Sequence, residues 1–208
     1  MRIISHRGYW LLPEEKNTCQ AFQRSFEMGF GTETDIRDCS GVLVISHDPP
    51  SGCEMPLRDF LALHADCDNT LPLALNVKAD GLQQAASELL AEFAVPEFFF
   101  FDMAIPDALG YLELNLPIYT RHSDIETELV LYESASGIWL DSFGPDWVEE
   151  TVIKKHLNAG KHVCLVSPEL HRRDHLEFWK HLAKWPITSH QNFILCTDYP
   201  VDAKELLS

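Results

Sequence analysis

GTETDIRDCSGVLVISHD, residues 31–48, predicts a β-strand with acids at alternate positions, Glu33 and Asp35, followed by a second β-like run. Residues i and i+2 of a strand point to the same side, so the two carboxylates are expected to project together. Such a pair is costly unless a cation neutralises it or one acid stays protonated. His47 follows the second run, 42–46. We interpret that run as a hairpin-and-loop excursion that can return His47 to the same site.

The rest of the chain alternates short apolar runs with helix-like stretches. The runs that predict strands are 2–5, 32–36, 72–77, 97–101, 117–119, 137–140, 162–166 and 193–196. The stretches that predict helices are 18–28, 57–64, 82–93, 106–112, 124–132, 146–158 and 173–184. Strands that alternate with helices indicate a parallel sheet covered on both faces. Eight such units predict an α/β fold, a compact (β/α)8 TIM barrel with a reduced insertion after the second strand, as a single domain of residues 1–208.

The composition limits the expected partners. The chain has 32 Asp plus Glu against 16 Lys plus Arg, a formal net charge of −16. An acidic surface repels nucleic acid and anionic membranes, so neither is an expected partner. We expect no membrane span and no leader, because the chain lacks a long apolar run and its start lacks a signal-like apolar core. The six cysteines form no CxxC pair, which favours free thiols and a cytoplasmic location; the oligomeric state stays open.

Polar side chains follow the predicted strands at the ends that form the active face of a barrel. His6 and Arg7 close the first strand, and Asn76 and Lys78 share one face at the end of the third. The arginine fork matches phosphate, and a histidine transfers protons near neutral pH. With His47, these residues suit phosphodiester cleavage, in which one histidine removes a proton from the attacking oxygen and the other protonates the leaving oxygen.

The two acids, Glu33 and Asp35, have two interpretations. Carboxylate oxygens are the ligands that Mg²⁺ and Ca²⁺ prefer, so Glu33 and Asp35 are candidates for a divalent metal site. In the alternative, Thr32, Thr34 and Ile36 face the core while the two acids face water, as in many strands. The neighbouring His-Arg pair favours the metal site. A single histidine is equally often a surface or capping residue, and most of the 10 histidines must be of that kind.

Three segments closely resemble the glycerophosphodiester phosphodiesterase family: ISHRG at 4–8, PEEKNTCQAF at 13–22 and GFGTETDIRDCSGVLVISHD at 29–48. LALNVK at 73–78 is a weaker match, and ILCTDYP at 194–200 resembles the closing strand of the family. The resemblance implies a (β/α)8 barrel, related in plan to phosphatidylinositol-specific phospholipases C. It also implies a metal-dependent phosphoric diester hydrolase, which cleaves a small-molecule glycerophosphodiester to glycerol phosphate and an alcohol.

The resemblance assigns a role to each matching position. It implies that the catalytic residues are His6 and His47, that Arg7 and Lys78 bind the substrate phosphate, and that the metal ligands are Glu33, Asp35 and Asn76. The family usually has a glutamate where this chain has Asn76, so the site has one negative charge less. Asp141 or Glu169 is a candidate to supply it. An adjacent glycerol hydroxyl is the implied internal nucleophile, which gains from proximity.

Two other functions remain open at this point. One is a phosphodiesterase for another envelope or phospholipid-headgroup phosphodiester. The other is a non-catalytic barrel that binds phosphate, which Asn76 favours and the paired His6 and His47 oppose. The sequence decides neither the alcohol nor the choice between Mg²⁺ and Ca²⁺.

Overall fold

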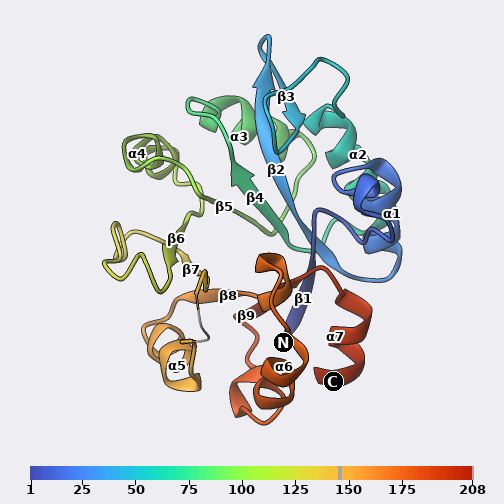
Figure 1. Ribbon diagram of the computed structural model, residues 1–208. Helices are drawn as coiled ribbons and strands as arrows, with labels where there is room; N and C mark the ends of the chain where they lie inside the picture. The colour runs from blue at the N-terminus through green and yellow to red at the C-terminus, as the bar shows by residue number, and fades with distance from the viewer. Residues whose placement is uncertain (145–146, 208) are drawn as a thin grey trace. The chain divides into compact units, whose positions relative to one another are not determined.

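The computed structural model describes residues 1–144 and 147–207. Within these residues one sheet holds nine strands, in the order β5-β4-β2-β1-β9-β8-β7-β6, with β3 paired to β2 outside this path (Figure 1). The strands are β1 (Arg2–His6), β2 (Gly31–Cys39), β3 (Val42–Ile45), β4 (Leu73–Val77), β5 (Phe98–Phe101), β6 (Tyr119–His122), β7 (Gly137–Leu140), β8 (His162–Val166) and β9 (Phe193–Thr197). β2, β4 and β5 pair in parallel, as do β6, β7, β8 and β9.

The strand order is that of a (β/α)8 barrel. Without β3, neighbours in the sheet are successive strands of the chain except for β1 and β9, the first and last strands, and β5 and β6 lie at the two ends of the path. A parallel bridge pairs Phe100 of β5 with Ile118, directly before β6, and the Phe100 amide donates to Pro117 O over 2.9 Å. The bridge joins the two ends of the path. The fold predicted from the alternation of strands and helices is therefore confirmed.

The helices follow the strands as predicted, with changes in their bounds. They are α1 (Cys19–Glu27), α2 (Leu57–Asp68), α3 (Gln83–Glu92), α4 (Ile105–Glu113), α5 (Glu150–Asn158), α6 (Leu176–Leu182) and α7 (Pro200–Leu207). α2 is longer than predicted, β6 begins and ends later, and α7 was missed. The predicted start of α5, residue 146, lies outside the described residues.

The helix predicted over 124–132 is wrong, because hydrogen bonds of Ser123 and Asp124, some of them to a distant part of the chain, hold another conformation. The Ser123 hydroxyl accepts hydrogen bonds from the amides of Ile125 and Glu126. The Asp124 carboxylate accepts hydrogen bonds from two amides of the loop after β7. Short polar side chains that bond nearby backbone in this way compete with a helix. Ile125 is 69% exposed and Val130 is 45% exposed, so the segment has no buried apolar face to stabilise a helix.

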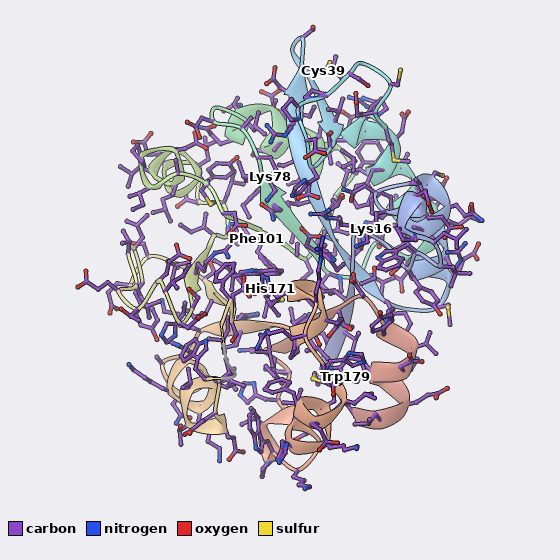
Figure 2. The ribbon with its side chains drawn as sticks, in the orientation of Figure 1. Lys16, Cys39, Lys78, Phe101, His171 and Trp179 are labelled. Carbon is purple, nitrogen blue, oxygen red and sulfur yellow. The ribbon has the colours of Figure 1, made fainter. Side chains whose placement is uncertain are left out.

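The chain divides into two compact units, each with its own core. We call Ser5–Ile118 the first unit, and Met1–Ile4 with Tyr119–Ser208 the second unit. In the first, Phe22 of α1 packs edge-on against Phe60 of α2, with ring centroids 4.7 Å apart. In the second, the fully buried Trp179 of α6 (Figure 2) belongs to an apolar cluster with residues of β7, β8 and β9.

The cysteines and the helices add two findings. All six cysteines, which lie within the described ranges, are free thiols, and Cys39 lies at the tip of the β2–β3 hairpin (Figure 2). Among the helices of residues 1–144 and 147–207, none is long and apolar enough to cross a membrane.

Candidate active site

The turn after β1 directs His6 and Arg7 to the neighbouring strand β2. Arg7 and Gly8 both have left-handed backbone, with φ of +59° and +82°, so the chain reverses sharply at the strand end. The Arg7 amide donates to Glu33 O over 2.9 Å, and the Gly8 amide donates to the Thr32 hydroxyl over 3.0 Å. These bonds fix the turn that carries His6 and Arg7 against β2, the strand that carries the two acids.

Both acids of β2 are buried. Glu33 is 1% exposed and Asp35 is 0% exposed, and every residue of β2 from Gly31 to Ile36 is buried. The alternation in which the two acids face water is therefore wrong. A buried carboxylate requires compensation by charge or hydrogen bonds, and the structure provides this differently for the two acids.

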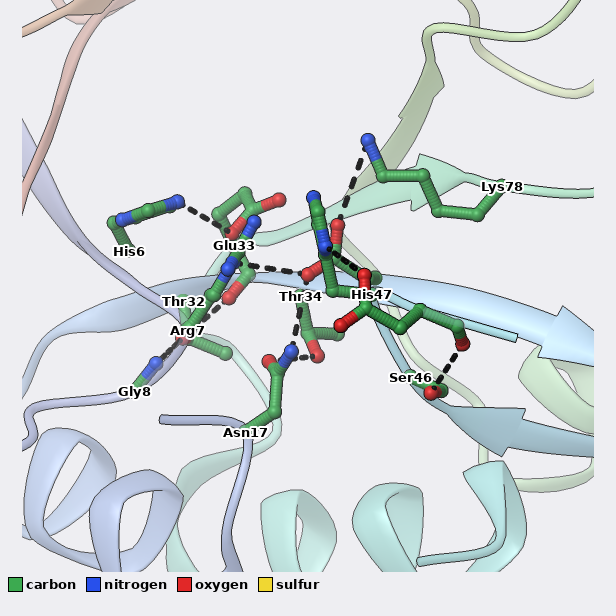
Figure 3. Close-up of polar contacts among 12 residues, drawn as sticks. His6, Arg7, Gly8, Asn17, Thr32, Glu33, Thr34, Ser46, His47 and Lys78 are labelled. Atoms are coloured by element: carbon green, nitrogen blue, oxygen red, sulfur yellow. Dashed lines mark hydrogen bonds and ion pairs between the residues drawn. The ribbon is translucent and has the colours of Figure 1, made fainter. Parts of the chain in front are cut away.

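Asp35 contacts donors from three parts of the first unit, namely Arg7, Asn17 and Lys78, which Figure 3 labels. Its Oδ2 lies 3.0 Å from Arg7 Nε and accepts a hydrogen bond from Asn17 Nδ2 over 3.0 Å. Its Oδ1 lies 3.6 Å from Lys78 Nζ. Arg7 and Lys78, the two residues predicted for phosphate, thus meet at one buried carboxylate.

Asn17 lies in the family-like segment 13–22 and is a secondary site candidate of the sequence, for which a helix N-cap is an equally good interpretation. Its side chain donates to Asp35 and accepts from the Thr34 hydroxyl over 2.9 Å, while its amide donates to Arg7 O over 2.9 Å. The cap of α1 is Thr18, whose hydroxyl accepts from the Ala21 amide. Asn17 therefore braces the loop against the strand that carries the acids.

Glu33 is compensated less completely than Asp35. Its Oε2 lies 3.9 Å from His6 Nε2, and this buried oxygen accepts no hydrogen bond. Burial, and then the charge of Asp35, raises the pKa of Glu33 well above its usual range. Arg7 and Lys78 oppose this shift. The carboxyl thus favours its neutral form unless a further positive charge is supplied.

Asn76 presents a third oxygen beside the two acids. It is 8% exposed and pairs with Asp35 in the parallel register of β2 and β4, so the two side chains share one face. Three buried oxygens accept no hydrogen bond here, namely Glu33 Oε2, Asp35 Oδ1 and Asn76 Oδ1. Hard oxygens without hydrogen-bond donors are the ligand set that suits Mg²⁺ or Ca²⁺.

The acids by themselves form an incomplete ligand set. Within residues 1–144 and 147–207, no group of three His, Cys, Asp or Glu side chains is arranged to hold a metal ion. A cation at Glu33 and Asp35 therefore depends on the amide oxygen of Asn76 or on oxygens from the substrate. The carboxylates of Asp141 and Glu169, considered as replacements, are already hydrogen-bonded within the second unit, to Arg121 and to the hydroxyls of Ser167 and Thr197.

The excursion after β2 forms as predicted and carries His47. β3 pairs antiparallel with β2 through a two-residue turn, and the Ser46 amide donates to Asp35 O over 3.0 Å. His47 therefore follows directly after the level of Asp35. Its side chain is 47% exposed, and its Nδ1 lies 2.9 Å from Asp48 Oδ1. In Figure 3 its ring points to the side on which Glu33 and the Lys78 amine lie. The joint action of His6 and His47 stays a prediction.

The fold and this group of buried acids facing cations define a (β/α)8 barrel with a polar site at the strand ends. The sequence matches no protein-family model, and no curated protein matches it. A provisionally assigned glycerophosphodiester phosphodiesterase from Galdieria sulphuraria has a similar structure, with a TM-score of 0.77 at 18% identity over 99% of this chain and 97% of the other.

Two further solved structures are similar to the chain. A phosphodiesterase from Oleispira antarctica, in complex with its product sn-glycerol-3-phosphate, has a TM-score of 0.72 at 16% identity over 100% of this chain and 96% of the other. A Ca²⁺-dependent phosphatidylinositol-specific phospholipase C from Streptomyces antibioticus has a TM-score of 0.57 at 10% identity over 100% and 96%. The resemblance seen in the sequence is thus confirmed for the fold, from which activity does not follow automatically.

Proposed function

We propose that the protein is a phosphoric diester hydrolase that cleaves a glycerophosphodiester to glycerol phosphate and an alcohol. The observation that carries the proposal is the fully buried Asp35, approached by Arg7 at 3.0 Å and Lys78 at 3.6 Å beside a second buried acid, Glu33. Two cationic side chains at a strand end are suited to bind the phosphoryl oxygens. Phosphodiesterases of similar fold, one of them holding glycerol phosphate, support this substrate class.

Arg7 and Lys78 bind and orient the phosphate in this proposal. Both side chains are about one fifth exposed, at 21% and 22%, while Asp35 is fully buried. A phosphate oxygen can therefore approach the two side chains from solvent, while their ion pairs with the buried Asp35 keep them in place. The two positive charges are thus already in position before the reaction, and no side chain has to be ordered during it. Charges placed in this way stabilise the negative charge that develops on the phosphoryl group in the transition state.

His47 is the base and His6 is the acid in the mechanism that fits these contacts. Donation from His47 Nδ1 to Asp48 leaves Nε2 as the acceptor. His6, whose Nε2 lies 3.9 Å from Glu33 Oε2, takes the remaining role of proton donor. His47 removes the proton from the glycerol hydroxyl next to the phosphate, and that oxygen bonds to phosphorus.

The bond from phosphorus to the alcohol oxygen then breaks, and His6 supplies the proton to the departing alcohol. The product of this half-reaction is a cyclic glycerol phosphate. In the second half, water gives a proton to His6 and attacks phosphorus, the ring bond breaks, and the freed glycerol oxygen takes the proton from His47. Both histidines return to their starting states, as a catalytic cycle requires.

A divalent cation, Mg²⁺ or Ca²⁺, is the proposed cofactor. Glu33, Asp35 and Asn76 would hold it, since each has a buried oxygen that accepts no hydrogen bond. When bound, it supplies positive charge to the phosphoryl oxygens. The Ca²⁺ dependence of the structurally similar phospholipase C supports this choice of ion class.

The test is release of glycerol phosphate from a glycerophosphodiester with Mg²⁺, Ca²⁺ or chelator, since this substrate carries the neighbouring hydroxyl that the mechanism uses. His6→Ala and His47→Ala should each lower kcat by at least about a hundredfold, the usual size of general acid–base catalysis. His181→Ala on the exposed face of α6 is the matched control and should leave the rate unchanged. Glycerophosphodiesters with different alcohols then identify the leaving group.

Two results would contradict the proposal. Hydrolysis that both histidine variants retain at the wild-type rate would exclude the acid–base mechanism. Binding of inorganic phosphate without turnover under any divalent ion would instead favour the phosphate-binding barrel, for which the amide at Asn76 is the supporting feature.

A further inference from the structure

Asp102 lies where β5 ends, next to the candidate active site. Asn76 pairs with Phe101 in the parallel register of β4 and β5, so Asp102 follows one residue beyond the level of Asn76. Its backbone has φ of +66°, a left-handed conformation that Asp and Asn adopt more readily than most residues.

Lys78 lies between Asp102 and the buried acid of β2. Its Nζ is 3.9 Å from Asp102 Oδ2 and 3.6 Å from Asp35 Oδ1. The other oxygen of Asp35 is 3.0 Å from Arg7 Nε, so both of its oxygens face cationic groups. A divalent cation that binds Asp35 must therefore compete with the Lys78 ammonium for Oδ1.

The amide at Asn76 weakens the cation in this competition. An amide oxygen can bind Mg²⁺ or Ca²⁺, but it adds no negative charge to balance the ion. The carboxylate of Asp102 on the neighbouring strand end gives Lys78 a second partner at nearly the same distance as the first. An ammonium repelled from Asp35 by a bound cation can thus stay ion-paired without leaving the site.

We propose that Asp102 is a positioning residue that holds Lys78 when a divalent cation occupies Asp35, and so replaces the charge that Asn76 does not provide. This inference rests on the proposed function, specifically on cation binding at Glu33 and Asp35. Without the carboxylate, Lys78 stays on Asp35 and competes more strongly. We expect cation affinity to fall by on the order of tenfold, because the ammonium displaced from Asp35 then loses its ion pair with Asp102.

The test is calorimetric titration of Mg²⁺ and of Ca²⁺ into the metal-free protein, without substrate. The variants are Asp102→Asn, Lys78→Gln and the double variant. Asparagine keeps the shape of the side chain and accepts the left-handed backbone, so the turn after β5 is preserved. Asp66→Asn, at an exposed position of α2, removes one charge outside the group of site residues and serves as the control.

Asp102→Asn should bind the ion about tenfold more weakly than wild type, while Asp66→Asn binds normally. In the Lys78→Gln background, the same substitution should change the affinity by less than about twofold, because its effect acts through Lys78. Unchanged affinity of Asp102→Asn would overturn the inference and leave the proposed function standing. An equal loss in both backgrounds would exclude action through Lys78. Wild type that binds neither ion would refute the cation site itself, and the inference with it.

Discussion

Replacing Asp35 with asparagine should destabilise the metal-free protein, because Arg7, Asn17 and Lys78 all direct donors at this carboxylate. Arg7 Nε and Asn17 Nδ2 lie 3.0 Å from Oδ2, and Lys78 Nζ lies 3.6 Å from Oδ1. An asparagine amide has one oxygen and one NH₂ group, so its NH₂ must face a donor on one side. The variant loses a negative charge and also creates a donor–donor contact.

The magnitude follows from the burial of the partners. Removing one member of a buried ion pair costs about 3–5 kcal/mol. Arg7 and Lys78 are 21% and 22% exposed and regain some water, and Glu33 loses the repulsion of Asp35, so we expect about 2–3 kcal/mol. For a chain of this length, that lowers the unfolding midpoint by about 4–12 °C.

The assay is thermal unfolding by circular dichroism in chelator, with Asp38→Asn as the control. Asp38 is an exposed acid on the same strand, and its substitution should change stability by less than about 0.5 kcal/mol. If Asp35→Asn melted together with Asp38→Asn and wild type, Asp35 would not be the buried charged centre that the contacts indicate.

Three further predictions concern cation binding, backbone geometry and pH. Asn76→Glu should tighten Mg²⁺ or Ca²⁺ binding by on the order of tenfold in calorimetry, since it adds a charged ligand; unchanged affinity would show that position 76 is not a ligand. Gly8→Ala places a Cβ 2.7 Å from Ala21 Cβ at φ +82°, whereas Gly29→Ala at φ +77° meets nothing within 4 Å. Gly8→Ala should lower the free energy of unfolding, measured in urea, by clearly more than the roughly 1 kcal/mol expected of Gly29→Ala, and equal losses would contradict the contact. Burial lowers the pKa of His156 to about 4. The neutral ring therefore contributes up to about 3 kcal/mol to the free energy of unfolding above about pH 6.5, and this contribution is lost as the pH falls to about 4. Urea unfolding at both ends of this range should show a smaller pH dependence for His156→Gln than for wild type, and an equal dependence would refute the assignment.

The strand positions could be predicted because their signals are local. Alternation of side chains along a strand and the apolar runs between turns are properties of neighbouring residues, and they identified β2 and its hairpin correctly. The helix predicted over 124–132 failed for a non-local reason. The carboxylate of Asp124 bonds amides of the loop after β7, at Phe143 and Gly144, and no pattern within the segment contains that information.

The candidate site divides in the same way. The amino-acid order alone determined that His6 and Arg7 end one strand, and that Glu33 and Asp35 share a side of the next, because chain connectivity and the two-residue period of a strand require it. The tertiary structure decided that both acids are buried and that Asn17 braces Asp35. It also decided that Lys78 is shared with Asp102. Burial and charge pairing depend on which strands become neighbours, and that is a property of the folded sheet rather than of any one segment.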